Sequence, residues 1–390
     1  MMMIKNNNNL KELLKLTMNN ITMSPYNKDL ISKYLLNYEN SRLNMTNLNN
    51  IEIDHNNFCS HFSGFLDGDG SLKTGRRDEG KRYNPTMVIE LHKDDWEYLD
   101  LLNKYFQFNT TLYYQNKNRN TVTLMVSNLT IINNVLIPLL NEYKLLGKKY
   151  YDYLLWKKLV DTYYNETMDK SEKLLICNKY RVLINKYNEI DKFPTMDHII
   201  NNINTPKVLG FIEAEGHFSI KPKLQKYLTR IEITQRKESE PYLKGIYNLI
   251  ENWYVDPIYK FKLKPMTKTL YKEENKLKVH ITGMDRLYYS VIPTILHYGL
   301  YTRKYIDFVL WMIGTIIRKH GLHHTMEGQL LLEEIRLSYN KNRYSTNNTK
   351  IPSLLNILKV LSMKPVYDPS KSHDINYRLH ASQTKINKNN

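Results

Sequence analysis

Cysteine and long apolar runs are scarce in this chain of 390 residues. The only cysteines are Cys59 and Cys177, which excludes a disulfide framework and a cysteine-rich zinc site. The most apolar segment, Phe308 to Ile317, lies between Asp307 and Arg318. It is much shorter than the roughly 18 residues that a membrane-spanning helix needs. We therefore predict a buried helix there, and a soluble protein with no membrane partner.

Targeting signals are also lacking at the N-terminus. Residues Met1 to Asn9 contain no apolar segment of the secretory kind, and they are not rich in arginine and serine as a transit peptide would be. The frequent Asn, Lys, Ile and Tyr residues are typical of an AT-rich genome. Some organellar genomes are of this type, so the composition hints at an organellar gene.

Acidic residues are outnumbered by basic ones. The chain has 56 Lys and Arg residues against 39 Asp and Glu, a formal net charge of +17. Such an excess favours a polyanionic partner, because phosphate contacts release condensed counterions. Solubility alone would also explain it, so charge does not decide the function. The length suits two domains, and 42% apolar residues argue against disorder.

One seven-residue pattern occurs twice. Gly64 to Gly70 and Gly210 to Gly216 both consist of a glycine, two large apolar residues, an acid, a small residue, an acid and a glycine. The copies begin 146 residues apart, which is about the size of a small domain. The sequence therefore predicts two related halves, each contributing acids.

Two further segments support the duplication. Residues 138–156 align without a gap to 293–311, at an offset of 155, and residues 88–93 align to 230–235, at an offset of 142. Loop insertions and deletions between equivalent elements produce such differences in offset. The repeat unit therefore runs from the acidic motif to a helix that contains tyrosine, aspartate and tryptophan.

The hydrophobic periodicity predicts the same order of elements in both halves: a helix, two strands, a helix, two strands and then helices. The first helix of each half ends at the last glycine of its motif. The predicted segments are an N-terminal extension with a short helix (1–54), a first repeat (55–164), a linker (165–204), a second repeat (205–325) and a basic C-terminal extension (326–390).

Small residues predict where the halves meet. Gly64 and Gly68 lie four residues apart on one helix face, as do Gly210 and Ala214. Small side chains at this spacing let two helix backbones approach closely. We therefore predict that the two motif helices form the joint between the halves.

The last acids of the motifs, Asp69 and Glu215, would then lie together at the base of the joint. Carboxylates at adjacent helix C-termini repel each other and face the negative helix ends. Mg²⁺ would offset this, because it takes carboxylate, phosphate and water oxygens. Two carboxylates, metal ions and a polyanion favour phosphodiester hydrolysis. Acids in surface turns are the simpler alternative, but two copies in matching contexts argue against it.

With these motifs the chain resembles the LAGLIDADG family in its single-chain, two-repeat form, which comprises homing endonucleases and intron-splicing maturases. The resemblance covers roughly residues 55–325. It implies an α+β fold of two pseudo-symmetric αββαββα repeats, each with a saddle-shaped antiparallel sheet, packed through the two motif helices. It also implies two active sites that use Mg²⁺, for which Mn²⁺ can substitute, to cut opposite DNA strands and leave staggered ends.

The resemblance implies roles for the acids. Asp69 and Glu215 match the metal-binding acids. Asp67 and Glu213 match the earlier acid of the motif, which is less often a ligand and is a supporting residue. Since Glu215 is longer than Asp69, the two cleavage sites should differ in geometry.

Basic and polar neighbours would complete the two sites. Lys149 and Lys304 match the basic residue of the family near each active site, with the register open by one residue in each half. Lys93 and Gln235 match the polar position at the end of the second strand, which orients water. The halves differ at this last position.

The resemblance also implies sheets that grip double-stranded DNA in the major groove. The basic residues expected on these sheet faces are Lys73, Arg76, Arg77, Lys81, Arg82, Lys221, Lys223, Lys226 and Arg230. A solvated basic face is the alternative for each of them. Because the two halves differ in sequence, the DNA site would be long and need not be palindromic.

Two functions fit the resemblance. The first is a mitochondrial, intron-encoded endonuclease that makes a staggered double-strand break at a specific site and so spreads its intron. The second, in addition or instead, is a maturase that binds its group I intron RNA without hydrolysis, with a helper splicing protein as a further partner. The basic terminal extensions favour RNA, while the retained acids favour cutting and argue against a mere DNA-binding regulator. We expect a monomer in either case.

Overall fold

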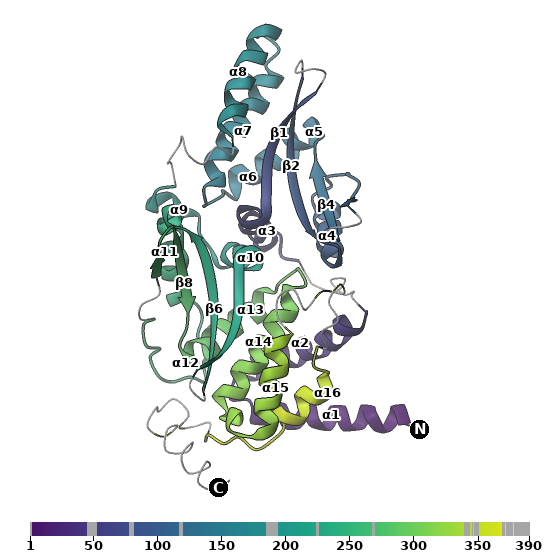
Figure 1. The fold of residues 1–390 in the computed structure, drawn as a ribbon, viewed down its shortest axis with the longest axis vertical. Coiled ribbons are helices and arrows are strands. Elements are labelled where there is room, and N and C mark those ends of the chain that lie inside the picture. The colour runs from purple at the N-terminus through teal and green to yellow at the C-terminus, as the bar shows by residue number, and fades with distance from the viewer. Residues whose placement is uncertain are drawn as a thin grey trace.

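A computed structural model shows the chain as an elongated α+β protein (Figure 1). The residues that it describes are 2–44, 53–77, 82–116, 120–184, 194–223, 226–266, 270–338, 344, 346, 351–368, 371 and 377.

The first repeat contains one antiparallel sheet with helices on one side. Its elements are α3 (His55–Asp69), β1 (Gly70–Arg77), β2 (Arg82–His92), η2 (Lys93–Asp95), α4 (Trp96–Tyr105), β3 (Tyr113–Asn116), β4 (Thr121–Val126), α5 (Leu129–Ile131), the π-helical turn η3 (Ile132–Leu136), α6 (Ile137–Glu142) and α7 (Lys149–Tyr164). The strand order is β1-β2-β4-β3.

The second repeat has the same element order. It consists of α10 (Thr205–Glu215), β5 (Gly216–Lys223), β6 (Lys226–Arg236), η4 (Lys237–Ser239), α11 (Glu240–Glu251), β7 (Leu270–Glu273), β8 (Lys276–Ile281), α12 (Met284–Arg286), η5 (Leu287–Val291), α13 (Ile292–Tyr298) and α14 (Lys304–Lys319). The strand order, β5-β6-β8-β7, is also equivalent. The predicted fold class is therefore confirmed.

A π-helical turn recurs at the same place in both repeats. The turns η3 and η5 begin 155 residues apart and are followed at once by Pro138 and Pro293 near the starts of α6 and α13. Proline lacks the N–H of a regular helix and its ring crowds the preceding turn. A wider turn before each proline lets the helix continue.

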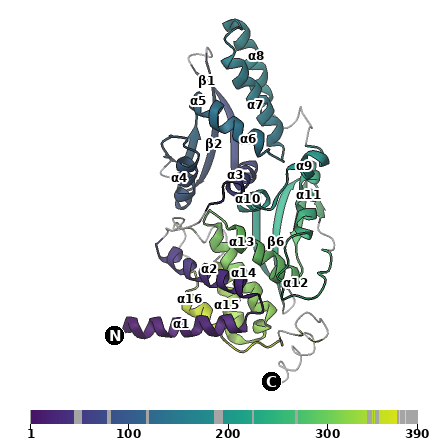
Figure 2. The ribbon, with the colours of Figure 1, turned by 180° about the vertical axis from the view of Figure 1, so that it is seen from behind.

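The motif helices α3 and α10 lie side by side between the two sheets (Figures 1 and 2). A Cβ atom added to Gly64 would come within 1.9 Å of the Lys207 carbonyl oxygen, and one added to Gly68 within 2.2 Å of the Ala214 Cβ. A Cβ atom added to Gly210 would likewise come within 2.0 Å of the His61 carbonyl oxygen in α3. Larger side chains would push the helices apart, so the small residues set their separation. The predicted joint is confirmed.

Each repeat buries its own core on the helix-covered side of its sheet. In the first repeat Trp156 of α7 is fully buried with strand residues such as Leu72 and Ile89. Trp311 of α14 occupies the equivalent place in the second. The segment from Phe308 to Ile317 is buried throughout within α14, as predicted. Among the described helices none is long and apolar enough to cross a bilayer.

The terminal segments, predicted only as extensions, pack on the second repeat. Helices α2 (Pro25–Asn44), α15 (Met326–Leu337) and α16 (Leu354–Leu361) pack against α14, and α1 (Met2–Asn20) packs on α2 and α16 (Figure 1). From α2, Ile31, Leu35 and Tyr38 are fully buried in the core of that repeat. The linker contributes α8 (Lys170–Leu183), against α7, and α9 (Met196–Asn202), against α11. The domain boundaries themselves stay a prediction.

Candidate active site

The two acids of each motif have opposite surroundings. Asp69 and Glu215 end α3 and α10, and their side chains are exposed at the base of the joint. Asp67 and Glu213, two residues earlier, are buried. Each helix therefore turns one acid into the protein and presents the other to solvent.

The buried acid of each motif holds the loop that precedes the last long helix of its repeat. Asp67 accepts hydrogen bonds from two backbone N–H groups of this loop, at 2.6 and 3.0 Å. Glu213 accepts one from the N–H of Thr302, in the equivalent loop, and another from His61 Nε2 at 2.7 Å. These contacts fix where α7 and α14 begin, which gives the supporting acids a structural task.

The first residue of each of these helices is a lysine that returns to the end of the motif helix. Lys149 Nζ donates to the carbonyl oxygens of Asp67 and Gly68, at 2.7 and 2.5 Å. Lys304 Nζ donates to the carbonyl oxygen of Gly216 at 2.7 Å, and at 3.4 Å to two in the last turns of α10. An ammonium group is favourable at a helix C-terminus, where the carbonyls carry partial negative charge. This geometry favours Lys149 and Lys304, and not the preceding Lys148 and Arg303, as the basic residues near the two sites.

Glu215 of the second repeat and Lys149 of the first line the same cavity. A cavity of about 270 Å³ beside the joint is lined by Lys149 of the first repeat and by Glu215, Gln235 and Ser239 of the second. We call these four residues the Glu215 site. The burial of Lys149 in this cavity wall lowers its pKa.

Around Asp69 the charges balance differently. Although its side chain is exposed, the protein atoms crowded around the base of the joint raise the pKa of Asp69 to about 6, because they displace water from the charged form. Attraction by Lys304 of the other repeat opposes this shift, and repulsion by Glu215 and Asp95 adds to it. We call Asp69, Lys304 and Asp95 the Asp69 site.

The donors at the base of the joint suit a hard cation. No cluster of three or more His, Cys, Asp and Glu side chains in the described part of the chain could hold a metal ion. Mg²⁺ takes one or two carboxylates and fills its remaining positions with phosphate and water oxygens. Asp69 and Glu215 fit that pattern.

The strand register corrects the sequence alignment of the second strands. The glycine after each motif starts the first strand, where Gly70 pairs with Ile89 and Gly216 pairs with Ile233. The equivalent residues of β2 and β6 are thus 144 apart, not 142. A slip of two residues keeps every side chain on the same face of a strand, so the alternating sequence pattern could not reveal the error.

This register changes the predicted pair of water-orienting residues. Lys93 and Gln235 are not equivalent: Gln235 corresponds to Leu91, and Lys93 corresponds to Lys237. Gln235 lines the cavity of the Glu215 site. Lys93 begins η2 with its side chain half-buried and does not line that cavity.

Asp95 was missed by sequence reasoning. It is buried, and its carboxylate accepts hydrogen bonds from the N–H of Arg303 at 2.7 Å and from the Tyr344 hydroxyl at 3.1 Å. The Tyr344 ring also stacks on His92. The equivalent of Asp95 is Ser239 in the other site. An acid after a strand usually serves as a helix cap, so no sequence signal pointed to this contact between the repeats.

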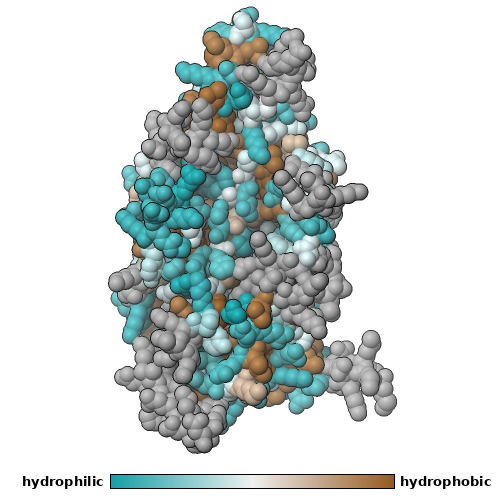
Figure 3. Space-filling view, in the orientation of Figure 1, coloured by the Kyte–Doolittle hydropathy of each residue, from teal (hydrophilic) through white to brown (hydrophobic). Residues whose placement is uncertain are grey.

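The predicted DNA-contacting residues lie along the sheets. Lys73 is exposed on β1, on the face opposite the buried Leu72. On the second sheet Lys221 and Arg230 contact Glu232 at 3.1 and 2.7 Å. Partial burial alone would raise the pKa of Glu232, but these two contacts hold it at about 2. Figure 3 shows mainly hydrophilic side chains where Figure 1 places β8 and α11.

The other basic residues of that prediction are described only in part. Lys81 lies outside the described residues. The backbone alone is described for those that flank the β1–β2 and β5–β6 turns, namely Arg76, Arg77, Arg82, Lys223 and Lys226.

Curated relatives are known at moderate identity. "Uncharacterized mitochondrial protein RF1" of Saccharomyces cerevisiae is 28% identical over 384 residues, which cover 95% of this chain and 76% of the relative. "Probable intron-encoded endonuclease 2" of Neurospora crassa is 24% identical, over 72% of this chain and 64% of the relative.

Solved structures share the fold. The I-LtrWI LAGLIDADG homing endonuclease bound to target DNA matches with a TM-score of 0.62 and 21% identity, covering 75% of this chain and 100% of that chain. I-SmaMI bound to an uncleaved DNA target in the presence of calcium ions matches with a TM-score of 0.61 and 18% identity, covering 74% and 100%. The sequence model of the LAGLIDADG endonuclease family matches residues 62–160 and 208–313. The chain therefore belongs to the LAGLIDADG endonuclease family.

Proposed function

We propose that this chain is a site-specific DNA endonuclease that hydrolyses one phosphodiester bond in each strand of a duplex. The observation that carries the proposal is the meeting of Asp69 and Glu215 at the base of the joint, each beside a lysine of the other repeat. The displacement of water around Asp69 disfavours its charged form, and repulsion by Glu215 and Asp95 adds to this. A bound cation and a phosphate would offset that cost.

Asp69 and Glu215 are the residues that would hold Mg²⁺, or Mn²⁺ in its place. Such an ion supplies an activated water and stabilises charge on the attacking and leaving oxygens of the phosphate. Lys149 and Lys304 each hold an ammonium group beside the scissile phosphate, fixed by the carbonyls at the motif helix ends. The Gln235 amide, in the cavity wall, orients a water molecule on its side of the joint.

The two repeats would each read one half of a long DNA site. The open faces of the sheets carry different side chains, with Lys73 on one and the Lys221, Arg230 and Glu232 group on the other. Unlike half-sites follow, so the target need not be palindromic. Since each site combines residues from both repeats within one chain, a monomer suffices.

The names of the relatives support a genetic setting for this activity. One is called mitochondrial and another a probable intron-encoded endonuclease. We propose a mitochondrial protein whose coding sequence lies in an intron and which cuts DNA that lacks that intron. Assistance in splicing that group I intron is a second candidate, favoured by the net charge of +17.

Selection from a random library tests the endonuclease proposal without knowledge of the host gene. The purified chain is incubated with random-sequence duplexes and Mg²⁺, and the cleaved ends are ligated to adaptors and sequenced. We expect one long site with a constant stagger. Asp69→Asn combined with Glu215→Gln should abolish these ends and leave DNA binding largely intact. The proposal fails if the unmodified chain yields no ends with Mg²⁺ or Mn²⁺, or if the double variant cuts as fast.

A further inference from the structure

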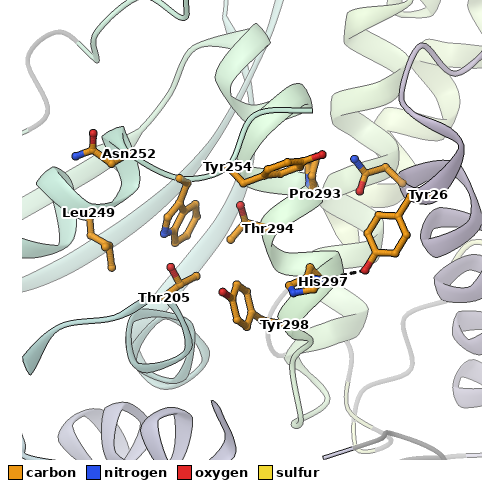
Figure 4. A pocket seen from close by; sticks show the side chains of 11 residues that line it. Tyr26, Thr205, Leu249, Asn252, Tyr254, Pro293, Thr294, His297 and Tyr298 are labelled. Atoms are coloured by element: carbon orange, nitrogen blue, oxygen red, sulfur yellow. Dashed lines mark hydrogen bonds between the residues drawn. The ribbon is translucent and has the colours of Figure 1, made fainter. Parts of the chain in front are cut away.

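A second cavity, of about 400 Å³, lies at the other end of α10 (Figure 4). Thr205, the first residue of that helix, lines it, whereas Glu215 ends the same helix. Eleven helical residues separate the two ends by roughly 15 Å. The cavity is therefore distinct from the Glu215 site.

Aromatic side chains from three elements surround this cavity. Tyr26 comes from α2, Tyr254 follows α11, and His297 and Tyr298 come from α13 (Figure 4). The Tyr26 hydroxyl and His297 Nδ1 are hydrogen-bonded at 2.9 Å, which fixes one wall. Tyr26 and Tyr254 are 56% and 52% exposed. Large exposed rings gathered at a cavity mark a binding site more often than single ones do.

Two buried polar atoms of the lining have no hydrogen-bond partner within the described residues. Trp253, only 5% exposed, has an unpaired Nε1–H donor, and Asn27, 1% exposed, has an unpaired Oδ1 acceptor. The Nδ2 of Asn27 already donates to Ser24 and Asp256, which fixes the amide orientation. Both atoms are shielded from water, so they do not reach a ligand in the cavity. The polar groups of the lining that remain for a ligand include Thr205, Asn252 and Tyr298.

The surroundings of the cavity are specific to the second repeat. The segment between α11 and β7 spans 18 residues (252–269), whereas the equivalent one in the first repeat spans seven (106–112). Buried Asp256 ties this longer segment to the N-terminal residues, because its carboxylate accepts from the N–H and hydroxyl of Ser24. Next along it, Lys260, Phe261, Lys262 and Lys264 are exposed.

We propose that this cavity binds an unpaired nucleobase of a single-stranded nucleic acid, with Lys260, Lys262 and Lys264 contacting neighbouring phosphates. A base is planar, stacks on aromatic rings and has donors and acceptors along its edge. These properties match the exposed rings and the polar side chains of the lining, Thr205, Asn252 and Tyr298. The cavity also has the volume of a small-ligand site. A duplex cannot fill it, because its bases are stacked and paired.

Charge decides between a nucleobase and an aromatic side chain of a partner protein. The segment that follows Tyr254 carries exposed lysines, in a chain of net charge +17, which favours a phosphate-bearing ligand. The inference goes beyond duplex cleavage and holds or fails independently of it.

Fluorescence anisotropy with the full chain tests the proposal. The probes are a labelled unstructured 12-nucleotide RNA, the same sequence as single-stranded DNA, and a duplex DNA. Tyr26→Ala with Tyr254→Ala should weaken single-strand binding by roughly tenfold or more and leave duplex binding unchanged. The matched double variant to Phe keeps the rings and should bind normally. So should Tyr164→Ala, which removes a tyrosine of similar exposure, 41%, at the end of α7.

Comparison of the RNA probe with the single-stranded DNA probe shows which kind of nucleic acid supplies the base. Preference for RNA over DNA of the same sequence would identify an RNA ligand, and equal affinity would identify any single strand; both agree with the proposal. Photocrosslinking of 4-thiouridine RNA should map to the lining.

Three results would overturn the proposal. They are the absence of single-strand binding by the unmodified chain, unchanged binding by the alanine double variant, and crosslinks confined to the sheets. The cavity would then be left for a protein side chain. Thermal melting of the alanine variant shows whether a loss of binding comes from unfolding. If it does, the crosslinks decide.

Discussion

The two repeats place the same parts around their exposed acids, but the neighbours of those acids differ. At the Glu215 site, Gln235 and Ser239 line an open cavity beside Lys149. At the Asp69 site the equivalent positions hold Leu91 and Asp95. One site thus offers neutral polar groups, and the other adds an apolar residue and a further negative charge.

What the repeats share is the framework, and what differs adjusts the chemistry. In both, a buried acid fixes the loop before a long helix and the first lysine of that helix caps the motif helix. In one alone, Asp95 adds to the repulsion that raises the pKa of Asp69. We therefore expect the two strands of a target to be cut at unequal rates, with the Glu215 site acting first.

The largest expected effect on the cleavage rate comes from replacing the two lysines one at a time, since each should affect a different strand. Lys149→Met should slow cleavage at the Glu215 site by about a hundredfold or more, because it removes a fixed positive charge beside the phosphate. Lys304→Met should do the same for the opposite strand. Cleavage of a duplex with a different label on each strand measures both rates.

Each lysine variant should then accumulate a product nicked in one strand. Lys158→Met, at an exposed position of α7, is the control and should cut like the unmodified chain. Equal slowing of both strands by either variant would contradict the pairing of each acid with the lysine of the other repeat.

The joint offers a second comparison, since His61 and Lys207 are equivalent positions with different partners. His61 donates to Glu213, while Lys207 donates to the Lys144 carbonyl near Asp67. Burial lowers the pKa of Lys207 to about 8, although Asp67 opposes the shift. The folded chain gives up this proton near pH 8, but an unfolded lysine keeps it to about pH 10.4. In between, the unfolded state binds more protons, so stability rises with pH.

Replacing Lys207 should remove that rise. Between pH 8 and 9.5 this one group contributes about 1.5 kcal/mol of increasing stability to the unmodified chain, and Lys207→Met should lack it. Urea unfolding at both pH values measures the difference, with Lys158→Met as an exposed control. Parallel pH profiles for the unmodified chain and Lys207→Met would show that Lys207 is not held in a charge-disfavouring site.

Sequence reasoning was strongest where a local rule sufficed. The close approach of α3 and α10 follows from Gly64, Gly68 and Gly210, because only small residues permit it. It was weaker where two residues satisfy the same rule. Lys148 and Lys149 were equally acceptable until the carbonyls at the end of α3 were located.

Contacts between distant segments could not be predicted. Ile31 and Leu35 of α2 are buried in the same core as residues of α14. These two helices lie more than 250 residues apart in sequence. Asp95 likewise gains its importance from Arg303 of the other repeat. Neither partner is visible in a local pattern. The two-residue slip between β2 and β6 had another cause, because an alternating pattern is unchanged by a shift of two residues.

The smallest expected effect comes from exchanging the residues at the corrected position. Gln235→Leu makes the Glu215 site resemble its counterpart, and it should slow one strand by about three- to tenfold, because the loss of one water-orienting hydrogen bond costs about 1 kcal/mol. Leu91→Gln should change only the other strand. Strand-resolved cleavage at saturating enzyme measures both, and Lys93→Met should have little effect by comparison. A larger loss for Lys93→Met than for Gln235→Leu would show that equivalence by strand register does not identify the residue that orients water.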